Sequence, residues 1–245
     1  MGKVIMSGIV PLLTAPIHGI AASTLSVGST VKLMESGSAV EYLVVNQGKP
    51  GGSSLYDDSC DGTWILRKEC LAARAWDSGN SNKYAESDIN EWLNGDFFDT
   101  LGTVGEKTVK QAKIPYGIGG GVATVNSGAN GLSVRAFLLG GYEIGWRNLQ
   151  EGYMPVDGAT LSYFTTGDTT AARAKRIANY DGSAVLWWTR ACRTDNSNTN
   201  AYYVYNDGRN FVGDVDDTAP RIRPALILPF NAKFDESTMI LKGVS

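Results

Sequence analysis

Histidine and cysteine are scarce in this 245-residue chain, and their scarcity excludes several kinds of site. The one histidine, His18, stands near the N-terminus and far in sequence from any carboxylate cluster, so no Ser-His-Asp or Cys-His catalytic site is expected. A zinc site with several histidines is excluded, and Cys60, Cys70 and Cys192 lack the paired spacing of zinc ligands. Because three is an odd number, a fully paired disulfide framework is excluded, and we expect free thiols.

Positive charge is also sparse. The chain has 22 Lys and Arg against 25 Asp and Glu, for a net charge of -3, and the basic residues are scattered. A nucleic-acid partner or an anionic membrane surface would select for a basic stripe, so neither is expected. No apolar run reaches the length of a transmembrane helix, so membrane insertion is not expected. With 43% hydrophobic residues the chain can bury a sizeable core.

Signals for metals and cofactors are weak. Asp214, Asp216 and Asp217 are close enough in sequence to ligate calcium, but the glycine and glutamate positions of an EF-hand are missing. A solvated acidic loop is therefore predicted there. The triple glycine at 119–121 lacks the Lys and Ser/Thr of a phosphate-binding loop. We predict no metal and no cofactor, and no pair of carboxylates points to a glycosidase.

The chain is interpreted as one α+β domain, residues 25–245, behind an N-terminal arm, residues 1–24. The arm has Lys3, an apolar middle and an Ala-rich end like a secretory signal, but Pro11, Pro16 and His18 interrupt the apolar stretch. A docking arm is favoured over a signal. The 29 glycines indicate many turns and long structured loops.

Local patterns predict short elements. Ser87 and Asp88 are good N-cap types before a helix that Gly95 would end, and Thr103 to Glu106 has the spacing of a capping box, with Val109 and Ala112 continuing that face. Hairpin turns are predicted at 35–38, between two short strands, and at 206–208, and a long loop is predicted at 117–131. Strands are predicted at 31–33, 41–45, 63–66, 132–139, 184–188, 202–205 and 225–228.

Large and cationic side chains near the C-terminus have structural interpretations. Trp187 and Trp188 are adjacent, so on a strand they face opposite sides, one in the core and one beneath a binding face. Arg190, Arg221 and Arg223 could each pair with a buried carboxylate or bind an anion. A structural role is favoured for Arg223, which directly precedes Pro224 at the start of a buried strand.

One segment has a biased composition. Residues 189–232 contain no Lys, Glu, Gln, Trp or Met, although these five types make up 34 of the remaining 201 residues. Asparagines at 196, 198, 200, 206 and 210 alternate there with Thr, Ser, Asp and Tyr. This is the composition of an antibody paratope, in which Tyr supplies rigid area and Asn supplies adaptable hydrogen bonds. The alternative is an ordinary polar hairpin on a β domain.

Several blocks resemble a domain found in phages and prophages of Gram-positive bacteria. The C-terminal blocks are WWTR at 187–190, YV at 203–204, DG at 207–208 and IRPAL at 222–226. The upstream blocks are VGSTV at 27–31, YLVVNQG at 42–48, KIPY at 113–116, SGANGL at 127–132 and FLL at 137–139. This family is similar to the variable proteins of diversity-generating retroelements, which have a C-type-lectin fold related to the formylglycine-generating enzymes.

The resemblance implies a mechanism for the biased composition. In such systems adenines near the 3′ end of the gene are mutated during copying, and a mutated Asn codon cannot become Lys, Glu, Gln, Trp or Met. The chain departs from the family at 189–192 (TRAC) and at Pro220 and Arg221, which leaves the limits of the variable region open. The Glu-Pro-Asn, Gln-Pro-Asp and Trp-Asn-Asp triplets of calcium-dependent sugar binders are absent. Cys192 has no evident partner, so the enzymatic activity is not carried over.

These observations predict a C-type-lectin-like α+β fold, with two helices on a twisted, mostly antiparallel sheet and a variable region at about 189–221. Trp187, Tyr203, Gly208, Arg223 and Pro224 are assigned to the scaffold. Tyr202, Tyr205 and Phe211 are the expected aromatic anchors. The predicted ligand-binding residues are Arg193, Asp195, Asn196, Asn198, Asn200, Tyr202, Tyr205, Asn206, Arg209, Asn210, Phe211 and Asp214.

The resemblance further implies a non-enzymatic display protein on a phage tail or bacterial cell surface. Its partners would be a host receptor, protein or glycan, and other virion proteins docked by the arm. A homo-oligomer, such as a trimer, would add avidity. Two alternatives stay open: a structural virion component without a ligand, and an enzyme on the formylglycine-generating-enzyme-like fold, which would need a concave pocket with convergent carboxylates or paired cysteines.

Overall fold

The central sheet of the computed structural model, which describes residues 16–147 and 152–244, has five antiparallel strands in the order β2-β3-β4-β15-β9. Ser36 and Gly37 both have positive φ, 47° and 83°, which matches the tight turn expected between β2 and β3. All four residues of β15 are buried, as predicted, because β15 lies between β4 and β9. The strands are β2 (Thr30–Glu35), β3 (Ser38–Gln47), β4 (Thr63–Arg67), β9 (Ala136–Phe137) and β15 (Ala225–Leu228).

The first helical segment begins as predicted and ends later. Helix α1 (Asp88–Trp92) starts behind Ser87, whose Oγ accepts a hydrogen bond from the Asn90 amide at 3.4 Å. The chain then continues as a π-helical turn, Leu93–Phe97. The prediction that Gly95 ends the helix was therefore wrong. Leu93 and Phe97 are buried on either side of this glycine, and their packing carries the helix through it.

The capping box predicted at Thr103 was also wrong. Helix α2 (Gly102–Thr108) begins two residues earlier than that box implies, behind Leu101, which makes no side-chain cap. Val109 is already extended, and Ala112 belongs to strand β5 (Ala112–Ile114). The Lys110 amide donates to the Ile227 carbonyl at 2.9 Å, so pairing with β15 ends the helical face. A further short helix, α3 (Thr170–Ala174), was not predicted.

The strand predicted at 132–139 is divided in two. Strand β8 (Leu132–Val134) pairs with β5, whereas β9 pairs with β15. Asn94 causes the break, because its Oδ1 accepts from the Arg135 amide at 2.8 Å and the Ala136 amide at 3.2 Å. The predicted loop at 117–131 also contains order: β7 (Val125–Asn126) pairs with β6 (Tyr116–Gly117).

A small sheet joins the two ends of the described chain. Strand β1 (Ile20–Ala21) pairs with β16 (Ala232–Phe234), and β16 pairs with β17 (Leu241–Val244). Ala22 is fully buried, so residues of the predicted arm contribute to the core. Residues 1–15 of the predicted arm lie outside the described residues, as do residues 148–151 and 245.

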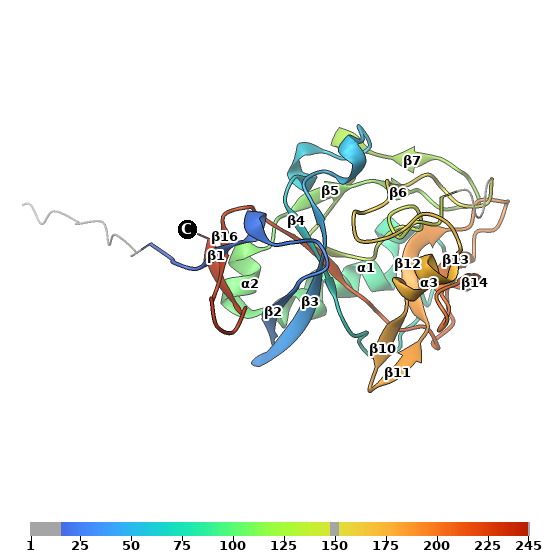
Figure 1. The fold of residues 1–245 in the computed structure, drawn as a ribbon. Helices are drawn as coiled ribbons and strands as arrows, with labels where there is room; N and C mark the ends of the chain where they lie inside the picture. The colour runs from blue at the N-terminus through green and yellow to red at the C-terminus, as the bar shows by residue number, and fades with distance from the viewer. Residues whose placement is uncertain (1–15, 148–151, 245) are drawn as a thin grey trace, which may run out of the picture.

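The last sheet carries the first part of the biased segment, which then continues into β15 of the central sheet. It has the order β12-β13-β14, with β12 (Trp187–Cys192), β13 (Asn200–Val204) and β14 (Asn210–Asp214), and the hairpin β10 (Ala178–Tyr180) and β11 (Ser183–Val185) precedes it. Figure 1 shows β12–β14 at one end of the molecule, whereas β1, β16, α2 and the C-terminus lie at the other. The buried apolar residues form one continuous cluster spanning both ends. The chain is therefore one α+β unit with strands that pair antiparallel.

Within the described part of the chain, no helix has both the length and the apolar character to cross a bilayer.

Candidate ligand-binding surface

The β13–β14 hairpin is fixed by its turn, as the sequence predicts. The Gly208 amide donates to the Tyr205 carbonyl at 2.9 Å, and the Asp207 carboxylate accepts from the Arg209 amide at 3.1 Å. Gly208 has φ 85°, and a Cβ there would lie 2.2 Å from the Arg173 carbonyl oxygen. Any other residue would clash with this backbone, so Gly208 docks the hairpin tip against helix α3.

Aromatic rings line one side of the hairpin. Trp188 and Tyr203 are edge-on with ring centroids 5.5 Å apart, and Phe211 lies 5.8 Å from Tyr203 and 5.3 Å from Tyr205. Exposure increases along the row: Trp188 is fully buried, Tyr203 is 9% exposed and Phe211 is 47% exposed. Trp188 is held by its indole N–H, which donates to the Arg74 carbonyl at 3.0 Å. A buried tryptophan thus supports an exposed aromatic face, as predicted for one of the two tryptophans.

The loop between β12 and β13 is organised by Asn82, a residue that sequence reasoning missed. Its buried side-chain amide donates to the carbonyls of Arg193, Ser197 and Asn200 at 3.0–3.2 Å, and its Oδ1 accepts from the Gly120 amide at 2.7 Å. The two N–H groups of this amide are therefore shared among three carbonyls, and its oxygen accepts one further hydrogen bond. Asn82 is 111 residues from Arg193 in the sequence, so no local pattern could have revealed it.

The twelve predicted contact residues occupy three places. Tyr205, Asn206, Arg209, Asn210 and Phe211 surround the hairpin tip. Arg193, Asp195, Asn196, Asn198, Asn200 and Asp214 gather at the opposite end of the same hairpin, where Asn200 donates to Asp214 at 2.7 Å and Arg193 forms a two-point ion pair with Asp195. The two groups of residues lie at opposite ends of β13, and its length from Asn200 to Val204 corresponds to about 14 Å.

Tyr202, the twelfth residue, is not at the surface. It is 1% exposed, its hydroxyl donates to the Tyr153 carbonyl at 3.1 Å, and its ring lies 6.5 Å from Trp146. Alternation along β13 places Tyr202 on the face opposite Tyr203, and the loop around Tyr153 covers that face. Tyr202 is a core residue, and its assignment as a contact anchor was wrong.

A buried ion network underlies the sheet. Arg190 is fully buried and donates to the Glu143 carboxylate at 2.6 and 2.8 Å and to the carbonyls of Pro115, Leu138 and Asp157. The sequence left open whether Arg190 pairs with a buried carboxylate or binds an anion, and in the structure it pairs with buried carboxylates. The arrangement uses the whole guanidinium, so none of its donors faces solvent.

Asp157 is the poorly satisfied member of this network. Its Oδ2 lies 3.5 Å from Arg190 Nε, and neither carboxylate oxygen has a hydrogen-bond partner. Burial raises the pKa of Asp157 to about 7, outweighing the opposing effect of Arg190.

The remaining predicted scaffold residues are buried. Arg223 is buried, and its Nε donates to the Arg67 carbonyl at 2.9 Å while its guanidinium lies 5.1 Å above the Trp187 ring, so its structural role is confirmed. Arg221 is stacked 3.6 Å over Tyr180. Tyr203 and Pro224 are also buried.

The three thiols are free, as predicted, and the structure shows that all three are buried. Burial raises the pKa of Cys60 and of Cys192 to about 12 and that of Cys70 to about 11, so almost no thiolate is present at neutral pH. Among the described residues no cluster of three or more His, Cys, Asp or Glu side chains could hold a metal ion. The side chains of Asp214, Asp216 and Asp217 are exposed, in agreement with a solvated acidic loop.

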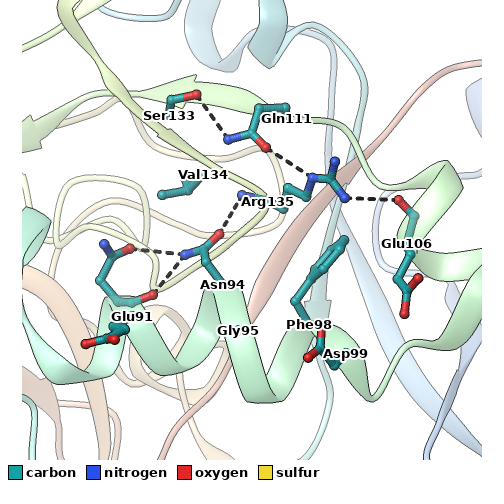
Figure 2. Close-up of a pocket in the computed structure, with 11 residues that line it drawn as sticks. Glu91, Asn94, Gly95, Phe98, Asp99, Glu106, Gln111, Ser133, Val134 and Arg135 are labelled. Carbon is teal, nitrogen blue, oxygen red and sulfur yellow. Dashed lines mark hydrogen bonds between the residues drawn. The ribbon is translucent and has the colours of Figure 1, made fainter.

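A hollow of about 650 Å³ lies elsewhere, between the π-helical turn and β8 (Figure 2). Figure 2 shows its polar side chains bonded to one another: Arg135 Nε donates to Gln111 at 3.1 Å, and Gln111 donates to Ser133 at 3.0 Å. The Arg135 guanidinium also lies 5.0 Å over the Phe98 ring. These groups stabilise the junction between β8 and β9, and they do not converge on a common point in the hollow.

Comparison with known proteins identifies a family whose description gives no function. Residues 61–230 match the family model described as Domain of unknown function (DUF6273). No curated protein matches the chain, and no solved structure matches it. The matched segment runs from β4 through β15 and includes the whole candidate surface. Since it covers well over half of the sequence, the chain belongs to the DUF6273 family.

Proposed function

We propose that this protein is a ligand-binding display module whose contact surface is the β12–β14 sheet with its loops, and that the surface is diversified by a retroelement. The observation that carries the proposal is a coincidence of two independent patterns. The first two thirds of the segment that lacks five residue types, 189–232, run from within β12 through the loop and the hairpin, and only its last part enters the buried strand β15. Strands β12–β14 lie at the end of the molecule away from the described termini (Figure 1).

The architecture supports this role in physical terms. Binding loops need a rigid support, and here Trp188, Arg190 and Asn82 fix the sheet and the 193–200 loop from beneath. None of the eleven surface members of the predicted set is buried, and of these Tyr205 alone packs against the core cluster. A chain that must tolerate many sequences at one surface needs this separation of contact residues from core residues.

The fold expected for such a protein is C-type-lectin-like, and we propose that assignment here. The support is the antiparallel central sheet, the helices α1 and α2 and the long connections. Display on a phage tail or bacterial surface, binding of a host receptor, docking of the N-terminal arm to other virion proteins and assembly as a trimer belong to the same proposal. Attachment through the end that holds β1 and the C-terminus would leave the hairpin facing outward (Figure 1).

Sequencing the gene across a clonal population tests the proposal. Changes should be confined to adenine-bearing codons, and they should fall on exposed positions such as Asn196, Asn198, Asn206 and Asn210. Codons for buried residues of the same segment, such as Tyr202, should stay constant. A search downstream of the gene should find a near-copy of its 3′ end and a reverse transcriptase gene.

An invariant gene with neither feature nearby would leave a structural virion component, or a domain of fixed specificity, as the better account. Binding can be tested directly by replacing Tyr205 and Phe211 with Ala, with Phe230→Ala as control, since Phe230 is also partly exposed and lies outside the hairpin. If the unmodified protein, the variant with Ala at 205 and 211, and the Phe230→Ala control attach equally to host cells, the hairpin is not part of the binding site.

A further inference from the structure

The exposed side of the hairpin is an aromatic face made of Tyr203, Tyr205 and Phe211. The Phe211 ring is inclined by 32° to Tyr203 and by 30° to Tyr205, and because Tyr203 is only 9% exposed, Phe211 and Tyr205 supply most of the accessible surface of this face. Trp188 packs edge-on beneath Tyr203 and holds it in place. The aromatic face is rigid before any partner arrives, which lowers the entropic cost of binding.

An acidic turn, Asp214 to Asp217, borders this face. The carboxylates of Asp216 and Asp217 are exposed and neither has an ion pair among the described residues, whereas Asp214 points to the opposite face of the sheet and accepts a hydrogen bond from Asn200. By contrast, Asp207 at the hairpin tip is paired with Arg209 at 2.7 Å. Tyr203 lies over Gly213, since a Cβ on that glycine would be 2.9 Å from the Tyr203 ring. Asp217 is near enough to add to the effect of burial in raising the Tyr203 pKa.

Strand β14 is also a free edge of its sheet, because among the described strands it pairs with β13 alone. At the two ends of the β13–β14 ladder, the Tyr205 amide donates to the Arg209 carbonyl and the Val215 amide donates to the Thr199 carbonyl. Hydrogen-bonded pairs alternate along an antiparallel ladder, so the amide and carbonyl groups of Asn210 and Val212 point away from β13. An extended chain could pair with these groups.

We propose that the partner bound here is a protein that supplies an extended basic segment, which pairs with the edge of β14 and places Lys or Arg side chains on the aromatic face beside the acidic turn. The inference rests on the proposed function and names the class of its ligand. Side chains of an added strand alternate between the two faces of the sheet. Every second one would lie beside Phe211 and Gly213, where the rings and the unpaired carboxylates both attract a cation.

The test is selection of a random-peptide library on the immobilised full chain, with removal of peptides that also bind the Phe211→Ala variant. The peptides that remain should be enriched in Lys and Arg. Their binding should weaken about 3-fold for each of Asp216→Asn and Asp217→Asn, which is the size expected for exposed charges, and it should weaken further with added salt. Asp96→Asn, an exposed carboxylate outside the hairpin, is the control and should change nothing.

The edge of β14 is tested by Val212→Pro, which removes an amide that makes no bond to β13, with Val212→Thr as the matched control. Binding of the selected peptides should fall about 10-fold in the proline variant alone, as expected for the loss of one or two hydrogen bonds. Urea unfolding of both variants checks that the hairpin is intact. If the proline variant does not fold, hydrogen–deuterium exchange at the Asn210 and Val212 amides of the unmodified protein is measured with and without the selected peptides instead. Slower exchange with the peptides bound supports edge pairing, and unchanged exchange contradicts it.

The outcomes separate this inference from the proposed function. Peptides that need Phe211 but are not basic would overturn the basic partner and leave the binding surface in place. The same holds if a glycan array, or self-association of the chain, shows Phe211-dependent binding while the peptide library shows none. If nothing that binds the chain depends on Phe211, both the inference and the proposed surface fail.

Discussion

Replacing Arg190 with Met should be among the most damaging single changes to this protein. The substitution keeps an unbranched side chain but leaves the Glu143 carboxylate, itself fully buried, without its cation. It also removes the donors to the carbonyls of Pro115, Leu138 and Asp157. Removal of one partner from a buried ion pair costs about 3–5 kcal/mol. Since a typical domain is stable by only about 5–15 kcal/mol, the variant should be close to unfolding at room temperature.

Urea unfolding followed by tryptophan fluorescence measures this effect, since the chain has six tryptophans. The double variant with Glu143→Gln should recover part of the loss, because the uncompensated charge is then gone. We expect a coupling of about 2 kcal/mol between the two sites. A loss below about 1 kcal/mol for Arg190→Met, or strict additivity in the double variant, would refute the reasoning that the network is held by this one guanidinium.

Three other predictions concern stability and binding. The pKa of Asp157 is about 7 in the folded state against an ordinary 3.8, so between these values the folded protein holds a proton that the unfolded chain releases. The free energy of unfolding should therefore fall by on the order of 4 kcal/mol as the pH rises from 4 to 7. Asp157→Asn should flatten this slope when unfolding curves are measured at several pH values. Tyr202→Ala should cost about 3–5 kcal/mol, whereas Phe211→Ala should cost below about 1 kcal/mol and act on binding instead; equal costs in urea would contradict their different burial. Asn82→Ala should destabilise the protein by about 2–3 kcal/mol and speed hydrogen exchange at 193–200, while unchanged exchange there would show that the loop is held by other contacts.

Features that depend on neighbours in the chain could be predicted from the sequence. The hairpin turns at Ser36-Gly37 and at 206–208, the cap at Ser87 and the buried strand β15 are set by a few adjacent residues, and the structure has each of them. The free state of the cysteines followed from their odd number and scattered spacing. Composition alone also marked a segment whose first part, from β12 through β14, lies at one end of the molecule, although its last part belongs to β15 of the central sheet.

Features that depend on distant partners could not be predicted. Asn94 divides a strand by capping the Arg135 amide, and Asn82 shapes a loop more than a hundred residues away. Tyr202 has the residue type of a contact anchor, but the loop around Tyr153 covers its face of the sheet. Local sequence encodes where a strand or turn forms, whereas only tertiary packing decides which face of a strand meets solvent. For that reason the fold kept eleven of the twelve expected contact residues at its surface, divided them between the two ends of one hairpin and placed the twelfth in the core.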